Sequence, residues 1–117
     1  MPLPETIRIL NAAAEPSRLR ILAALRARRM CVCELCAALG LKQSVMSQHL
    51  RVLRDAGLVL DSKNGLWVDY ELTAAARKAK VLKAILAEAA QDQAIVADRR
   101  AAAKADRAVL CGPGKRG

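Results

Sequence analysis

Two short helical patterns separated by a glycine, with a hairpin pattern directly after them, constrain the fold of this chain more than any other feature. The first pattern covers residues 33–39 and ends at Gly40, and the second begins near Gln43 and runs to Gly57. Apolar residues recur through the second pattern at helical spacing: Val45, Met46, Leu50, Val52 and Leu53. Two helices joined by a few residues that include a glycine form a helix-turn-helix.

The hairpin pattern occupies residues 58–72. Two apolar runs flank the pair Asn64-Gly65, which is typical of a tight turn between antiparallel strands. One face of the second run is apolar and is expected to be buried: Leu66, Val68, Tyr70 and Leu72. The alternate residues are expected to point away from the core: Trp67, Asp69 and Glu71. The sequence thus predicts a half-buried strand pair, or wing, beside the helix-turn-helix.

Helical patterns also occupy both ends of the chain. One is expected over residues 4–14 and another over 16–29, with Pro16 in the first turn of the second. Residues 73–110 are rich in alanine and contain no Gly or Pro, which predicts one long helix or two. The fold class is therefore mainly α with a small β-hairpin, a winged helix-turn-helix formed by one domain over residues 1–110. Residues 111–117 are predicted to be a disordered tail.

The last helical stretch has more apolar positions than a small core can cover. They are Val81, Leu82, Ile85, Leu86, Ile95, Val96, Val109 and Leu110. A chain of 117 residues buries only a modest fraction of its surface by itself. We therefore expect part of this stretch to pack against a second copy of the chain in a homodimer.

The charge balance favours a polyanionic partner. The formal net charge is +9 and the isoelectric point is near 10.0, and clustered Lys and Arg displace condensed counterions from a phosphate backbone. Double-stranded DNA is the first candidate. No run of 18 apolar residues occurs and the first residues do not resemble a secretory signal, so the protein is expected in the cytoplasm without a membrane partner.

The second helix of the predicted helix-turn-helix begins with side chains suited to reading DNA. Such a helix lies in the major groove with its N-terminal residues at the base edges. The polar residues expected there are Gln43, Ser44, Ser47, Gln48 and His49. The cations expected to reach phosphates are Lys42, Arg51 and Arg54. Lys63 and Asn64 at the wing tip are expected near the adjacent minor groove. The plainer interpretation is the solvated face of an amphipathic helix.

Three of the four cysteines, Cys31, Cys33 and Cys36, fall within six positions. In a reducing cytosol such a cluster favours ligand or redox roles over structural disulfides or simple packing. If all three lay on one ideal helix, Cys33 and Cys36 would be about 60° apart and Cys31 about 160° from Cys33. We therefore expect that an ion bound to all three would unwind or delay the first helical turn and disturb the adjoining recognition helix.

The number of thiols indicates which ion could bind. Three thiolates fit the pyramidal shell of trivalent arsenic or antimony, whereas zinc requires a fourth ligand, such as Cys111 or Glu34. Zinc, cadmium and lead remain alternatives, and the role of Cys111 is undetermined. The spacing from Cys33 to Cys36 also occurs in thiol oxidoreductases, but those place it beside a βαβ unit that this sequence does not predict. The chain is therefore not expected to be an enzyme.

These residues together resemble the ArsR/SmtB family of metal-responsive repressors. The resemblance covers most of residues 15–72, in the stretches 15–22, 30–36, 44–60 and 63–70. Its most specific part is the run Cys-Val-Cys-Glu-Leu-Cys, which is similar to that of the family's arsenite and antimonite sensors. Lys42 departs from the family pattern, in which a Ser or a similar capping residue is common.

The resemblance implies a repressor of an arsenic-resistance operon that forms a homodimer through its first and last helices. Release from the operator would follow when arsenite or antimonite binds Cys31, Cys33 and Cys36. Cadmium and lead sensors of the family add cysteines in an N-terminal extension, and zinc and nickel sensors use histidines on the last helix. Neither pattern occurs in this sequence. A thiol-based sensor of redox state or persulfides with the same fold is the remaining alternative.

Overall fold

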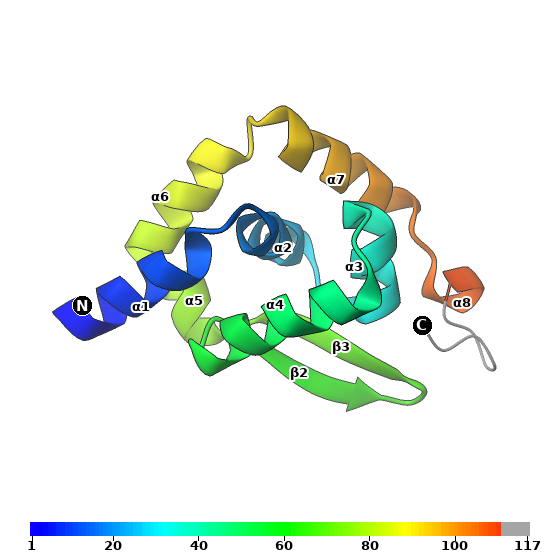
Figure 1. The fold of residues 1–117 in the computed structure, drawn as a ribbon, viewed down its shortest axis with the longest axis horizontal. Helices are drawn as coiled ribbons and strands as arrows, with labels where there is room; N and C mark the ends of the chain where they lie inside the picture. The colour runs from blue at the N-terminus through cyan, green and yellow to red at the C-terminus, as the bar shows by residue number, and fades with distance from the viewer. Residues whose placement is uncertain (111–117) are drawn as a thin grey trace.

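The computed structural model describes residues 1–110, which form helices around a small antiparallel sheet (Figure 1). The elements are α1 (Leu3–Ala13), α2 (Pro16–Ala27), β1 (Met30–Cys31), α3 (Val32–Leu39), α4 (Gln43–Asp55), β2 (Val59–Asn64), β3 (Trp67–Leu72), α5 (Ala74–Lys78), α6 (Lys80–Ala89), α7 (Gln93–Lys104) and α8 (Arg107–Leu110). This confirms a mainly α winged helix-turn-helix. The predicted tail over 111–117, including Cys111, lies outside the described residues.

The helix-turn-helix consists of α3 and α4. Helix α3 ends at Gly40, whose φ of +68° is the left-handed conformation that glycine adopts without strain and that allows its N–H to bond Cys36 O at 2.8 Å. Met46, Leu50 and Leu53 fix α4 against the core. Val45 and Val52 were expected in the same stripe but are exposed. The buried face of α4 therefore contains fewer of its apolar residues than the sequence pattern predicted.

The sheet has the order β1-β3-β2, so the short β1 extends the predicted hairpin to three strands. Cys31 of β1 pairs with Asp69 of β3, and Asn64 of β2 pairs with Trp67. The connecting loop is therefore Gly65-Leu66, one position later than the Asn64-Gly65 turn predicted from the sequence. Gly65 has a φ of +63°, as the first loop residue of a type II′ hairpin turn requires.

The predicted division of β3 into an inner and an outer face is correct only at the base of the wing. Leu72 is buried and Tyr70 is half-buried, as expected. Near the tip, however, Leu66 and Val68 are 53% and 42% exposed, while Asp69 on the face predicted to be outward is only 1% exposed. Asp69 is buried because the side chains of Arg107 and Asn64 cover its carboxylate and donate hydrogen bonds to it.

The stretch from residue 73 onward forms four helices, α5 to α8, and not the one or two that were predicted. Thr73 caps α5 by accepting a hydrogen bond from Ala76 N–H at 3.0 Å, and Asp92 caps α7 by accepting from Ala94 N–H at 2.8 Å. Helices α6 and α7 curve around α2, and α7 and α8 pack against α3 (Figure 1). Residues 93–110 therefore return to α3, the helix that carries Cys33 and Cys36.

The core lies between α2, α3, α4 and α6. Its largest fully buried apolar residues are Ile21, Leu22, Leu25, Met30, Leu35, Met46, Leu50, Leu53, Val59 and Leu82. Burying a Leu or Ile side chain contributes about 1.5–3 kcal/mol, so these residues hold the helix-turn-helix rigidly. No helix among residues 1–110 is long and apolar enough to span a membrane.

Candidate nucleic-acid interface and thiol site

The polar face of α4 is open to a partner. Its exposed residues are Gln43, Ser44, Ser47, Gln48 and Arg51, and Lys42 is exposed just before the helix. Lys42 occupies the N-cap position without a capping side-chain hydrogen bond, which fits its departure from the usual capping residue. The face that the sequence predicts to read DNA is thus presented outward on a helix anchored by three core residues.

His49 differs from its neighbours because its imidazole is half-buried. Its Nε2 lies 4.0 Å from Glu15 Oε1, and the imidazole is 18% exposed. Glu15 also caps α2, accepting a hydrogen bond from Arg18 N–H at 2.9 Å. The imidazole therefore faces the start of α2, and a contact between His49 and DNA stays a prediction.

The wing places its two predicted contact residues in different environments. Lys63 is exposed near the tip of β2. The exposed Asn64 instead donates its side-chain amide to Asp69 Oδ2 at 3.2 Å. Arg54 of α4 lies 3.6 Å from Asp61 of β2, which ties the wing to the recognition helix. Of the two tip residues, Lys63 is the better placed for a phosphate contact.

Cys31 lies just before α3 and not on one helix with Cys33 and Cys36. It ends β1 and is the N-cap of α3, with extended backbone (φ −82°, ψ 169°) and 2% exposure. Cys33 and Cys36 are half-buried on the first and second turns of α3. Among the described residues, no three His, Cys, Asp or Glu side chains are close enough together to hold a metal ion. Cys33 is disulfide-bonded, so a site formed by all three thiols requires its reduction and stays a prediction.

A capping box explains why Cys31 is excluded from the helix. Glu34 Oε1 accepts the Cys31 backbone N–H at 3.0 Å, and the Cys31 sulfur accepts the backbone N–H of Glu34. Such boxes typically pair Ser or Thr with Glu three residues later. The spacing Cys31-x-x-Glu34 is thus a signal for the start of α3, although Glu34 was predicted only as a possible metal ligand.

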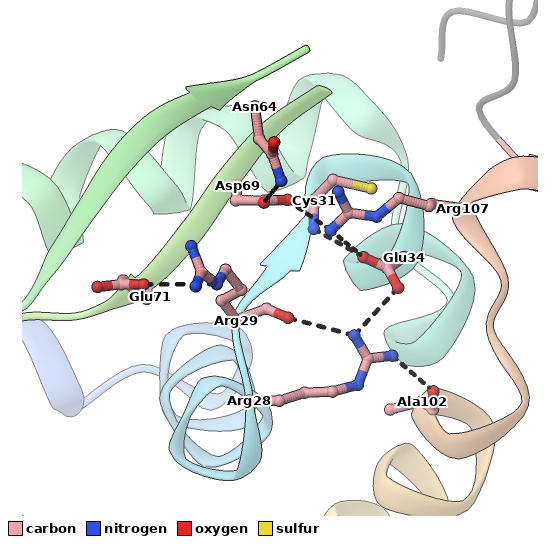
Figure 2. Close-up of polar contacts among 9 residues, drawn as sticks. All are labelled: Arg28, Arg29, Cys31, Glu34, Asn64, Asp69, Glu71, Ala102 and Arg107. Atoms are coloured by element: carbon pink, nitrogen blue, oxygen red, sulfur yellow. Dashed lines mark hydrogen bonds and ion pairs between the residues drawn. The ribbon is translucent and has the colours of Figure 1, made fainter. Parts of the chain in front are cut away.

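Glu34 is also the centre of a buried ionic network (Figure 2). Its carboxylate, 5% exposed, accepts hydrogen bonds from Arg28 at 3.0 Å and from Arg107 at 3.1 Å. Arg107 also bonds the buried carboxylate of Asp69, and its guanidinium lies 5.2 Å from the centre of the Trp67 ring. No local pattern predicts this network, because Arg107 is 73 positions from Glu34 and 38 from Asp69.

Burial and hydrogen bonding have opposite effects on the acids of this site. Burial raises the pKa of the Cys31 thiol and that of the Cys36 thiol, so both are protonated at neutral pH and a bound soft ion would displace their protons. Burial would also raise the pKa of Glu34. Hydrogen bonds from Cys31 N–H and Arg28 outweigh it and lower the pKa, so this carboxylate stays charged.

A second buried ion pair fixes α7. Arg20 of α2 donates two hydrogen bonds to Asp98, at 2.7 and 2.8 Å, and a third to Leu39 O at 2.8 Å. The hydrogen bond to Asp98 raises the pKa of Arg20, so the guanidinium remains charged. The two-point geometry joins α2, the end of α3 and α7 at one guanidinium.

A helix-turn-helix with an exposed polar recognition face, followed by a two-stranded wing, defines the class of winged-helix regulators. The model of bacterial regulatory proteins of the arsR family matches residues 15–60. The chain belongs to this family, and its resemblance to ArsR/SmtB regulators is confirmed.

Similarity to individual proteins agrees with this assignment. The arsenical resistance operon repressor of Escherichia coli K12 is 43% identical over 68 residues, which cover 57% of this chain and 58% of that protein. The chain spans about half the length of the curated relatives it matches.

Two solved structures have the same fold. The transcriptional repressor BigR from Xylella fastidiosa has a TM-score of 0.64 at 30% identity and covers 74% of this chain and 84% of its own. Reduced HlyU from Vibrio cholerae N16961 has a TM-score of 0.64 at 34% identity and covers 75% and 87%. The named relatives are regulators, in line with the expectation that the chain is not an enzyme.

Replacement of Glu34 by Gln tests the capping box and the ionic network. We expect E34Q to lower the free energy of unfolding by about 1–3 kcal/mol at neutral pH, because a buried charged acceptor is lost. A carboxylate with a lowered pKa in the folded state stabilises the fold above its ordinary value of 4.5, and this contribution disappears as the pH falls. Urea denaturation should therefore show the difference between wild type and E34Q shrinking in acid.

The matched control is Glu88→Gln, which changes an exposed glutamate of α6. Its effect should be small at every pH. A loss in E34Q that is equally large in acid and at neutral pH would contradict the charged network.

Proposed function

We propose that this chain is a transcriptional repressor that binds operator DNA as a homodimer and is released when arsenite or antimonite binds Cys31, Cys33 and Cys36. The observation that supports this most is the position of the thiols. They lie at the start of α3, which is connected through Gly40 to α4. All three are within residues 15–60, the part of the chain that matches the arsR family. A change at the thiols thus acts on the element directly before the recognition helix.

The DNA-binding half of the proposal depends on α4 and the wing. The exposed residues Gln43, Ser44, Ser47 and Gln48 would meet base edges, and Arg51 and Lys63 would meet phosphates. Two such surfaces in a symmetric dimer would read two half-sites about one helical turn apart.

The homodimer is supported by an apolar face on α1. Leu3, Ile7 and Leu10 are 73%, 46% and 39% exposed. Together with the C-terminal helices this face would pack on a second copy, as the family resemblance implies. Burial of such a face would supply the apolar area that one short chain lacks.

Substitutions on α4 and the wing test the DNA surface. For a duplex that the protein has selected from random sequences, we expect Gln48→Ala to weaken binding by about 1–3 kcal/mol and to relax the preference at one position. Lys63→Ala should weaken binding to all sequences alike and reduce the slope of log affinity against log salt by about 1.

The matched control is Lys83→Ala, which removes an exposed cation from α6, away from α4 and the wing. The salt slope of this variant should equal that of wild type. Equal slopes for Lys63→Ala and Lys83→Ala would contradict the proposed role of the wing.

The inducer half of the proposal depends on the chemistry of the three thiols. Soft thiolates suit trivalent arsenic and antimony, and three of them balance the charge of the ion. Cys31 is buried and held by the capping box with Glu34. For its sulfur to join Cys33 and Cys36, this backbone arrangement must change, and the start of α3 must change with it.

Fluorescence anisotropy of the labelled duplex, with reduced protein and increasing arsenite, tests this directly. We expect arsenite to weaken DNA binding by about tenfold or more, which is within the usual range of allosteric coupling. The response should be lost in Cys31→Ser, Cys33→Ser and Cys36→Ser, and retained in Cys111→Ser as the control. Unchanged DNA affinity with arsenite shown to be bound would contradict the proposal.

Sensing of redox state by the thiols is the second candidate. It is favoured by the disulfide bond of Cys33, beside the free thiols of Cys31 and Cys36, and by the absence of any three-ligand group in the described part of the chain. Redox chemistry does not require three sulfurs on one ion. This candidate predicts that Cys31→Ser keeps a response to peroxide or polysulfide that depends on Cys33 and Cys36. A response to arsenite that needs all three thiols would exclude it.

A further inference from the structure

Two buried carboxylates from separate parts of the fold share one guanidinium. Glu34 of α3 and Asp69 of β3 have side-chain exposures of 5% and 1%, and Arg107 at the start of α8 donates to both. Burial of a carboxylate is costly unless a cation and hydrogen bonds compensate for it. Arg107 therefore attaches α8 to both α3 and β3.

The two carboxylates lie on either side of Cys31. Glu34 accepts the Cys31 N–H, and Asp69 is the residue paired with Cys31 across β1 and β3. Asp69 also accepts the side chain of Asn64, at the end of β2 beside the wing turn. A continuous chain of contacts thus runs from the backbone of Cys31 through Glu34, Arg107 and Asp69 to the wing tip (Figure 2).

We propose that Arg107 is a clamp through which the thiol segment controls the wing, in addition to the direct path from α3 to α4. This inference rests on the proposed function for the identity of the effector. When Cys31 moves toward Cys33 and Cys36, its N–H leaves Glu34 and that carboxylate shifts away from Arg107. The guanidinium is then drawn from its position over Asp69, and the contacts that orient the wing tip are lost.

Trp67 is a built-in reporter of the clamp. It is the one tryptophan of the chain, and its ring lies 5.2 Å from the Arg107 guanidinium. A cation at this distance from an indole affects its surroundings directly. Movement of Arg107 therefore changes the emission of Trp67, whereas a rearrangement confined to α3 and α4 leaves it unchanged.

Arg107→Met tests the clamp in the reduced full-length chain, because it removes the charge and keeps a long apolar side chain. Arg100→Met is the matched control, since it removes an exposed arginine of α7. Sodium arsenite is the probe. Three quantities are measured for each protein: the number of thiols protected from alkylation, the emission of Trp67, and the change in affinity for the selected duplex.

In wild type and R100M, arsenite should protect the thiols, change Trp67 emission and weaken DNA binding. In R107M the thiols should still be protected, but the Trp67 response should be absent. The arsenite-induced change in DNA affinity should be reduced by about threefold or more. A DNA response in R107M equal to that of wild type, with thiols protected, overturns the clamp.

Two further measurements keep the test decisive. If R107M does not fold, Arg107→Lys and Asp69→Asn replace it. Lys retains one charge and should preserve part of the coupling, and Asn should reduce it.

If wild type binds no arsenite, the proposed function fails, and amide hydrogen exchange tests the clamp alone. R107M should then exchange faster than R100M in both residues 30–34 and residues 67–70. Unchanged exchange in both segments overturns the clamp.

Discussion

The arrangement of this chain depends on the buried carboxylate of Glu34. It accepts the Cys31 N–H at the start of α3 and bonds Arg28 and Arg107. The first bond keeps Cys31 in extended backbone and begins the helix at Val32. The other two attach the end of α2 and the end of the described chain to the same point. A single carboxylate thus sets the position of the first thiol, the start of the helix-turn-helix and the path of the C-terminal segment.

Because of this constraint, a movement of the Cys31 thiol also changes the backbone at the start of α3. A cysteine in the middle of a helix can change partners with little effect on the backbone, but Cys31 is an N-cap whose N–H and sulfur are both used. Withdrawing it frees a buried carboxylate and the two cations that depend on it, and lost partners of buried charges are costly. Helix α3 is connected through the turn at Gly40 to α4, whose buried side is fixed by core residues. Under the proposed mechanism, a change at the thiol segment therefore alters both the recognition helix and the wing.

The sequence predicted the parts that local patterns encode. The boundary at Gly40, the start of α4 at Gln43 and the hairpin near Gly65 follow from helical spacing and turn residues, and all appear in the structure. The local patterns did not predict burial that depends on contacts between residues distant in the sequence. Asp69 was predicted to point outward because Arg107, which covers its carboxylate, lies 38 positions away in the sequence. The breaks within residues 73–110 were missed because they contain no Gly or Pro; the break before α7, for example, is marked only by the capping residue Asp92. The half-buried position of His49 was not predicted because its neighbour Glu15 lies at the start of another helix.

The central claim is that capture of a ligand by the thiols moves the DNA-reading elements through the start of α3. Backbone-amide NMR of the reduced chain during titration with arsenite measures this residue by residue. The account predicts that the Cys31 amide shifts strongly and that the amides of Ser47 on α4 and Asp69 on β3 shift with the same dependence on concentration. Shifts confined to residues 31–36, with α4 and the wing unchanged, would contradict it.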